Sequence, residues 1–102
     1  MAAKQHFFGI IRPYRKDFLT NPKVNEVKIM NDHFSYLKKL LDMKKLYLAG
    51  PTLITEDPFG VIILETETEE EAKQLLESDP SVKNGIQIID DFRPIRLSLT
   101  RD

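Results

Sequence analysis

The longest periodic stretch of the chain predicts an amphipathic helix. Over residues 24–45, apolar side chains recur every three or four positions and polar ones occupy the other side, as expected at 3.6 residues per turn. His33 lies on the apolar side, between two rows of apolar positions. An ionisable side chain placed there is either a core histidine with satisfied hydrogen bonds or part of a functional site. The two rows are Val27, Met30, Phe34, Leu37 and Leu41, and Ile29, Tyr36, Leu40 and Met43.

Four shorter segments predict strands. Residues 6–12 and 61–64 are apolar at both odd and even positions, which is typical of strands covered on both faces. Residues 46–48 lead into an Ala-Gly-Pro bend, and residues 56–60 contain the proline and glycine of a turn. These signals predict a hairpin between 46–48 and 61–64. A last strand, or a pair of short strands, is expected within residues 86–99.

A second helix is predicted to begin after Thr68. Residues 68–71 (Thr-Glu-Glu-Glu) fit a capping box with acidic side chains in the first turn, where they favour a helix N-terminus. The helix is expected to end near Asp79, because Pro80 disfavours the helical conformation for the residue before it.

Together these segments predict one α+β domain over residues 1–102. Their order, βαββαβ, is that of the ferredoxin-like fold, in which two helices cover one face of a four-stranded antiparallel sheet. The other face would be open, yet segments 6–12 and 61–64 are apolar there as well. Because a monomer rarely leaves a large apolar patch in water, we expect a homodimer that packs two open sheet faces together.

Charge and hydropathy narrow the choice of partners. The 15 Lys and Arg residues are balanced by 16 Asp and Glu residues, so no strong field favours nucleic acid or an anionic membrane. RNA-recognition modules share the element order, but segment 61–64 is aliphatic where such a module carries stacking aromatics. No apolar run approaches the ~20 residues of a membrane span. The first residues lack the apolar core of a signal peptide, so we expect a cytoplasmic protein.

The sequence offers little for metals or cofactors. It has no cysteine, and its two histidines are far apart, so the usual spacings of metal ligands are missing. No glycine-rich loop follows Gly50 and Pro51, so a phosphate-binding loop is not predicted there. We expect a small-molecule ligand and neither a metal nor a cofactor.

Taken in order, several short motifs resemble the YCII-related (YciI-like) family. This resemblance covers nearly the whole chain and implies a ferredoxin-like fold that pairs into a dimeric α/β barrel. Related barrels include monooxygenases, isomerases and dehalogenating enzymes for small, often aromatic molecules. Relatives often carry an aspartate soon after Gly-Pro, whereas here residues 52–55 intervene before Glu56 and Asp57. The motifs are His-Phe-Ser-Tyr-Leu-Lys-Lys-Leu at 33–40, Leu-Ala-Gly-Pro at 48–51, Gly60, Glu-Glu-Ala at 70–72, Asp-Pro at 79–80 and Gly85.

The resemblance also implies a candidate catalytic pair, His33 and Asp79, because family members carry histidine and aspartate at these positions. In such a pair the carboxylate would hold the imidazole tautomer and the ring would transfer a proton. Each residue has a simpler explanation: a core histidine for His33, and turn chemistry before Pro80 for Asp79. A non-catalytic ligand-binding or regulatory module of the same fold is therefore the alternative to an enzyme.

Four further residues are candidates for substrate binding. Arg12 and Tyr14 flank Pro13 at the end of the first strand, where they could form an anion clamp and a phenol donor. Their simpler explanation is a solvated pair at a strand end. Gly50 and Pro51 are the other two candidates, although a backbone bend alone also accounts for them.

Overall fold

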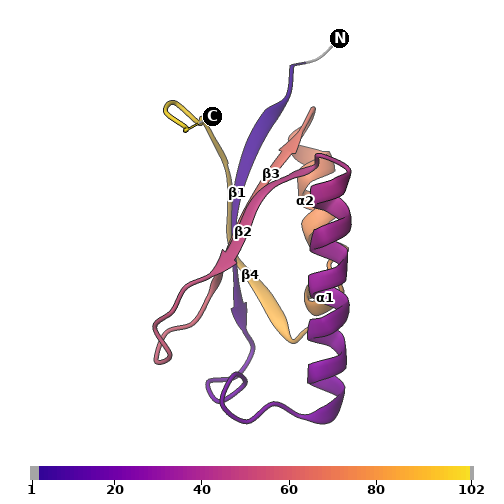
Figure 1. Ribbon diagram of the computed structural model, residues 1–102, viewed down its shortest axis with the longest axis vertical. Helices are drawn as coiled ribbons and strands as arrows, with labels where there is room; N and C mark the ends of the chain where they lie inside the picture. The colour runs from indigo at the N-terminus through magenta and orange to yellow at the C-terminus, as the bar shows by residue number, and fades with distance from the viewer. Residues whose placement is uncertain (1–2, 102) are drawn as a thin grey trace.

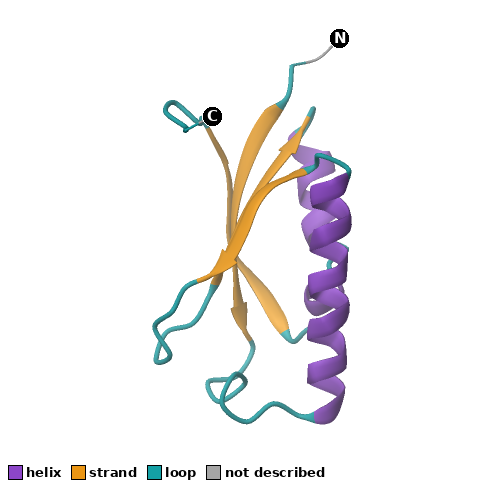
Figure 2. Cartoon of the chain, viewed as in Figure 1, coloured by secondary structure: helices purple, strands orange, loops and turns teal. Residues whose placement is uncertain are grey.

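The computed structural model describes residues 3–101, which form a four-stranded sheet with all helices on one face (Figures 1 and 2). The strand order is β2-β3-β1-β4, and every neighbouring pair is antiparallel. The predicted α+β arrangement with the element order of the ferredoxin-like fold is thus confirmed. The elements are β1 (Gln5–Pro13), α1 (Val24–Asp42), β2 (Leu46–Pro51), β3 (Gly60–Thr66), α2 (Glu69–Glu77), α3 (Pro80–Lys83) and β4 (Gln87–Ile95).

The core lies between the sheet and the helices. Phe7 and Ile11 on β1 are buried, and they alternate with half-buried residues whose side chains point to the helix-free face. Phe7 pairs with Leu64 of β3 in the register, so their side chains share one face. The core cluster consists of Phe7, Ile11, Leu40, Leu46, Ile62, Leu64, Ala72 and Leu76.

The helix-free face is apolar in the centre, as predicted. Phe8 pairs with Ile63, and Ile10 pairs with Val61, so four apolar side chains from the two central strands lie together on this face. Ile88 of β4 is more than half exposed. No helix within residues 3–101 is long and apolar enough to cross a membrane.

The first helix ends three residues earlier than predicted. The N–H of Lys44 donates to the carbonyl of Leu41, and the N–H of Lys45 donates to the carbonyl of Leu40. This pair of bonds is the Schellman motif. It requires a left-handed residue, and Lys44 supplies it with φ of 61°. The prediction was wrong here because lysines in a last turn favour a helix but do not mark where it stops.

Two other differences follow Asp79. The chain forms a short helix, α3, before β4, and Asp79 is its N-cap with Pro80 in the first turn. Proline suits that position because its missing N–H would have no partner there. The last segment forms one strand that ends at Ile95, rather than continuing toward residue 99.

Candidate functional site

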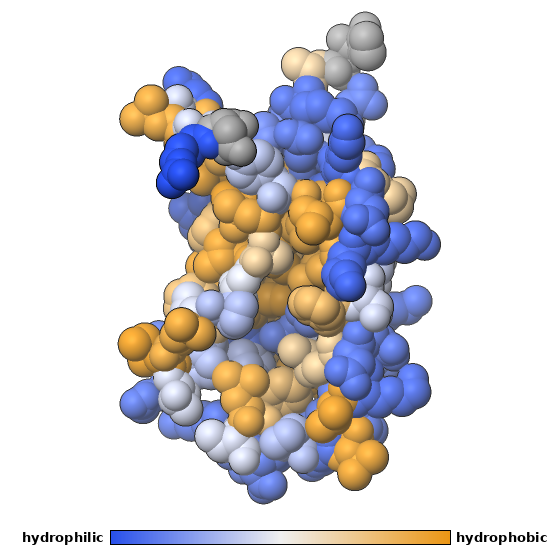
Figure 3. All heavy atoms as spheres, in the orientation of Figure 1, coloured by the Kyte–Doolittle hydropathy of each residue, from blue (hydrophilic) through white to orange (hydrophobic). Residues whose placement is uncertain are grey.

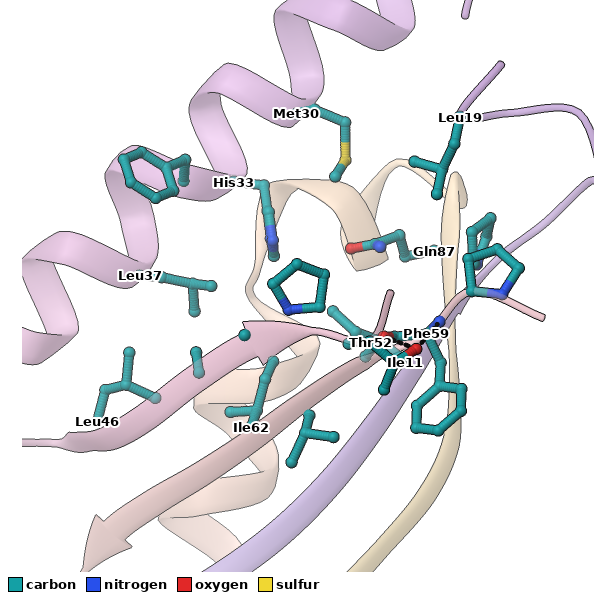
Figure 4. Close-up of a pocket in the computed structure, with 18 of the residues that line it drawn as sticks. Ile11, Leu19, Met30, His33, Leu37, Leu46, Thr52, Phe59, Ile62 and Gln87 are labelled. Carbon is teal, nitrogen blue, oxygen red and sulfur yellow. Dashed lines mark hydrogen bonds between the residues drawn. The ribbon is translucent and has the colours of Figure 1, made fainter. Parts of the chain in front are cut away.

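A cavity of about 490 Å³ lies between α1 and the sheet, at the end where β2 and β3 are joined. Its size is within the range of small-molecule sites, and its wall is mostly apolar. Figure 3 shows apolar side chains gathered in the hollow between the strands and α1, with polar side chains along the outer side of the helix. Apolar residues of the wall include Leu19, Met30, Leu37, Leu46, Phe59 and Ile62 (Figure 4).

His33 borders this cavity and is paired with Asp79. The Nδ1 atom of His33 lies 2.7 Å from Oδ2 of Asp79. The His33 side chain is 13% exposed and that of Asp79 only 1%. A contact of this length between an imidazole nitrogen and an enclosed carboxylate oxygen is a strong polar interaction. The predicted partners therefore meet, although they are 46 residues apart in sequence.

The carboxylate of Asp79 is held in place from its other side. Its Oδ1 atom accepts from the backbone N–H of Ser81 at 2.8 Å, and the hydroxyl oxygen of Ser81 lies at the same distance from it. The N-cap geometry of α3 provides the first of these bonds. Asp79 is thus both the turn residue of the simpler explanation and the partner of His33, so the two roles do not exclude each other.

The pairing defines what each imidazole nitrogen can do. A carboxylate accepts hydrogen bonds, so His33 donates from Nδ1 and its Nε2 keeps a free lone pair in the neutral ring. Nearby, burial and then the charge of Asp79 raise the pKa of Tyr36. The Tyr36 hydroxyl donates to the carbonyl of Leu75 at 2.6 Å. Tyr36 therefore remains a neutral phenol that attaches α1 to α2.

Two polar residues of the site, Ser81 and Gln87, were missed by sequence reasoning. The Ser81 hydroxyl lies 2.8 Å from Oε1 of Gln87 and 3.3 Å from Nδ1 of His33. Gln87 is 7% exposed and lines the cavity. Figure 4 shows His33 and Gln87 reaching toward the same end of it. A sequence signal was present, because a glutamine that interrupts the apolar segment 86–89 must find polar partners when buried.

Gly50 and Pro51, the other two candidates for substrate binding, line the cavity, whereas Arg12 is not among its described wall residues. Its guanidinium donates to Asp90 at 2.7 Å and to Asp57 at 2.8 Å, and these partners raise its pKa. The same group lies 4.7 Å from the centre of the Phe59 ring. Arg12 is not among the described residues of the cavity wall, so its predicted role as an anion clamp has no support in this geometry.

Tyr14 also lies outside the cavity wall that the structure describes. Its hydroxyl donates to the buried carboxylate of Glu26 at 2.5 Å, and Arg15 donates to the other oxygen of Glu26 at 2.5 Å. The Arg15 guanidinium is the main reason that the pKa of Glu26 is lowered to about 2. The backbone N–H of Lys23 donates to Glu26 as well, so this network fixes the start of α1. Tyr14 thus has a structural role at the start of α1, and its role as a phenol donor to a ligand stays a prediction.

Comparison with known proteins identifies the family of this α+β domain. The sequence model of the YCII-related domain matches residues 7–93. The chain belongs to the YCII-related domain family.

Two solved structures are similar to this chain. One is the 5-chloro-2-hydroxyhydroquinone dehydrochlorinase of Burkholderia phenoliruptrix in complex with 2,5-dihydroxybenzoquinone, with a TM-score of 0.60 and 25% identity over 88% of this chain and 91% of that chain. The other is an uncharacterized protein from Thermotoga maritima, with a TM-score of 0.52 and 11% identity over 91% of this chain and 99% of that one, a likeness of fold alone. No curated protein matches the sequence.

Proposed function

We propose that this protein is an enzyme that acts on a small molecule, aromatic compounds included, by proton transfer through His33 and Asp79. The observation that carries the proposal is the buried 2.7 Å contact between Nδ1 of His33 and Asp79, with His33 at the wall of an apolar cavity. In this pair Nε2 of His33 is the general base, and Asp79 orients the ring and stabilises the imidazolium that forms.

Covalent catalysis is less consistent with the site. Ser81 is the nearest hydroxyl, but it is buried and bonded to Asp79 and Gln87. It faces Nδ1 of His33, the nitrogen that Asp79 already occupies. A serine nucleophile needs a free basic nitrogen beside it and access to the substrate. The geometry therefore favours a proton shuttle over an acyl or glycosyl intermediate.

The similar dehydrochlorinase supports a ring-shaped substrate. That protein is named for a reaction of a chlorinated hydroxyhydroquinone and was solved with 2,5-dihydroxybenzoquinone. A cavity of about 490 Å³ with a largely apolar wall can enclose a ring of this size. We therefore take hydroxylated six-membered rings as the first compounds to test.

The test is deuterium exchange into 2,5-dihydroxybenzoquinone, because exchange reports proton transfer without knowledge of the physiological product. We expect the parent protein to accelerate the loss of the ring C–H signal in D2O, as measured by proton NMR. His33→Ala should return the rate to that of buffer, whereas Lys39→Ala, on the exposed side of α1, should not. Binding of the quinone without faster exchange would instead support the non-catalytic ligand-binding module.

The variant Asp79→Asn tests the orienting role separately. Asparagine can still cap α3, but its amide can donate to Nδ1 of His33 and so favour the tautomer that carries the proton on Nε2. We expect nitrogen NMR shifts of His33 to report this change of tautomer, together with a large fall in the exchange rate. An unchanged tautomer would show that Asp79 does not set the protonation of the ring.

We also propose that two copies pair through the helix-free sheet face. The support is the apolar group Phe8, Ile10, Val61 and Ile63 in the centre of this face. Light scattering should give about twice 11.9 kDa. Ile10→Asp should dissociate the dimer because an unpaired charge is costly to bury, whereas Val24→Asp, on an exposed position of α1, should not. A monomeric parent at micromolar concentration would contradict the pairing.

A further inference from the structure

The side-chain nitrogen of Gln87, Nε2, has no hydrogen-bond partner among residues 3–101. The Oε1 atom of Gln87 accepts from the Ser81 hydroxyl at 2.8 Å, and none of the described residues accepts from Nε2. Every fully buried side-chain nitrogen or oxygen in the described part of the chain has a hydrogen-bond partner. Because Nε2 has none, it is not fully buried. Gln87 lines the cavity, so we take Nε2 to be open to it. Since only 7% of the residue is exposed, the rest of the side chain is enclosed by protein and its direction is constrained.

From this arrangement we propose that the amide Nε2 of Gln87 binds the substrate oxygen on which negative charge develops when His33 removes a proton. The inference rests on the proposed function and deepens it, because it defines the substrate class. The substrate would be a carbonyl compound, or the vinylogous equivalent in a ring, with an acidic C–H next to the carbonyl.

The step balances without any other reactant. The C–H bond breaks and its proton goes to Nε2 of His33. The C–H electron pair forms a carbon–carbon double bond, and the π pair of the carbonyl moves to its oxygen. The resulting enolate oxygen accepts from Nε2 of Gln87, a donor held in position before the charge appears. The imidazolium then returns the proton to the same carbon or to another.

Ser81 positions this donor. Its hydroxyl lies 2.8 Å from both Oδ1 of Asp79 and Oε1 of Gln87. A hydroxyl has one proton to donate, and Oδ1 of Asp79 already accepts from the backbone N–H of Ser81. With the hydroxyl proton directed to Oε1 of Gln87, that oxygen is held away from the cavity and Nε2 is turned toward it. The same residue thus links the base pair and the oxyanion donor, which places both at one end of the cavity.

A phenolate is a stable imitation of the enolate, because it presents one oxyanion on a planar ring. The probe is 4-nitrophenol, whose anion is coloured, so that spectrophotometric titration reports both the affinity and the ionisation of the bound form. The parent should bind the anion in preference to the neutral phenol. Gln87→Met, close to the glutamine in size, should weaken binding of the anion roughly ten- to a hundredfold, as expected for a hydrogen bond to a charged group.

Two further variants keep the result interpretable. Gln74→Met makes the same change on the exposed surface of α2 and should leave binding unchanged. Gln87→Glu replaces the donor by a carboxylate and should exclude the anion altogether. Circular dichroism and urea unfolding identify any variant that has merely lost its fold, and in that case Gln87→Asn, which keeps an amide but shortens its reach, replaces it.

The outcomes separate this inference from the proposed function. If Gln87→Met binds the anion as the parent does, or if the parent binds no phenolate, the donor role of Gln87 is overturned. If the parent binds the neutral phenol in preference to the anion, the cavity-facing group of Gln87 accepts rather than donates, which also overturns it. Because phenolate binding requires no proton transfer, the donor role can be upheld even when the deuterium exchange shows no catalysis.

Discussion

The two long helices meet the same sheet in different ways. Helix α2 packs against it closely: Ala72 is fully buried, and a Cβ atom added at Gly9 would lie 3.0 Å from Cδ2 of Leu76. Helix α1 is more than twice as long, yet Leu40 is its only buried apolar residue. The cavity lies beneath α1. Side chains therefore fill the space between the sheet and α2, whereas those between the sheet and α1 enclose a cavity.

Polar contacts hold α1 where apolar packing does not. Its first turn is fixed by Glu26 and Arg15, its middle by His33 and Asp79, and the next turn by Tyr36 and the carbonyl of Leu75. Each of these bonds fixes a distance and a direction, whereas apolar contacts alone would let the helix collapse onto the sheet. We therefore expect these bonds to maintain the cavity, and His33 contributes one of them from the cavity wall.

The largest expected effect on the free energy of unfolding comes from shortening one leucine on α2 and, for comparison, one on α1. Leu76→Ala removes atoms from a fully packed position and should cost about 2–5 kcal/mol. Leu37→Ala should cost clearly less, because Leu37 already borders the cavity and its removal enlarges existing space. Urea unfolding of both variants measures the difference. Equal losses would show that α1 packs as tightly as α2.

A pair of glycine variants makes the opposite change. Gly9→Ala adds a methyl group against confined Leu76 and should cost about 1 kcal/mol, the lower end for overpacking, because the end of a leucine side chain can shift. At Gly50, on the cavity wall, an added Cβ meets nothing within 4 Å, so Gly50→Ala should leave the melting temperature unchanged or slightly higher. A larger loss at Gly50 than at Gly9 would contradict the contrast between the two sides.

Much of this architecture could be predicted from sequence because it depends on local chemistry. The period of segment 24–45 predicts α1 and its inward face, and Thr68 with the following glutamates predicts the start of α2. Thr68 does accept from the N–H of Glu71. Binary patterns determine which side of an element is buried, so the confirmed fold needed no knowledge of distant contacts.

The site could be predicted only in part, because its polar partners come from distant segments. His33 was recognised from its own helix, and Asp79 was assigned to it only through the family resemblance. Gln87 meets them because the loop containing α3 brings β4 back beside β1. The partners of Arg12 could not be predicted for the same reason: its strand-end position was clear, but Asp57 and Asp90 lie 45 and 78 residues away. Local patterns locate a charged side chain without identifying what neutralises it.

Acid should loosen α1 before α2. The unfolded-state pKa of Glu26 is near 4.5 and its folded-state pKa is about 2, so its contribution is fully present above pH 4.5 and is lost as the pH falls toward 2. The free energy of unfolding of the parent should exceed that of Glu26→Gln near neutral pH. This difference should shrink as the pH is lowered from 5 to 3. Amide exchange should rise first in the first turn of α1. Simultaneous loss of protection in α2 would mean that the network does not hold α1 separately.

The smallest expected effect distinguishes the cavity side of α1 from its outer side. Lys38 carries the only fixed charge among the described residues of the cavity wall, and its neighbour Lys39 lies outside it. Since both lysines are exposed, their electrostatic contribution is modest and screened by salt. Lys38→Gln should weaken binding of the 4-nitrophenol anion by up to about fivefold at low salt, and Lys39→Gln should not.

The difference between the two lysine variants should vanish at high salt. The loss of binding caused by Gln87→Met should persist, because a hydrogen bond from an enclosed amide is little screened. Equal effects at Lys38 and Lys39 would mean that ligands sense only the general charge of the helix, and that the opening beneath α1 does not guide anions to His33.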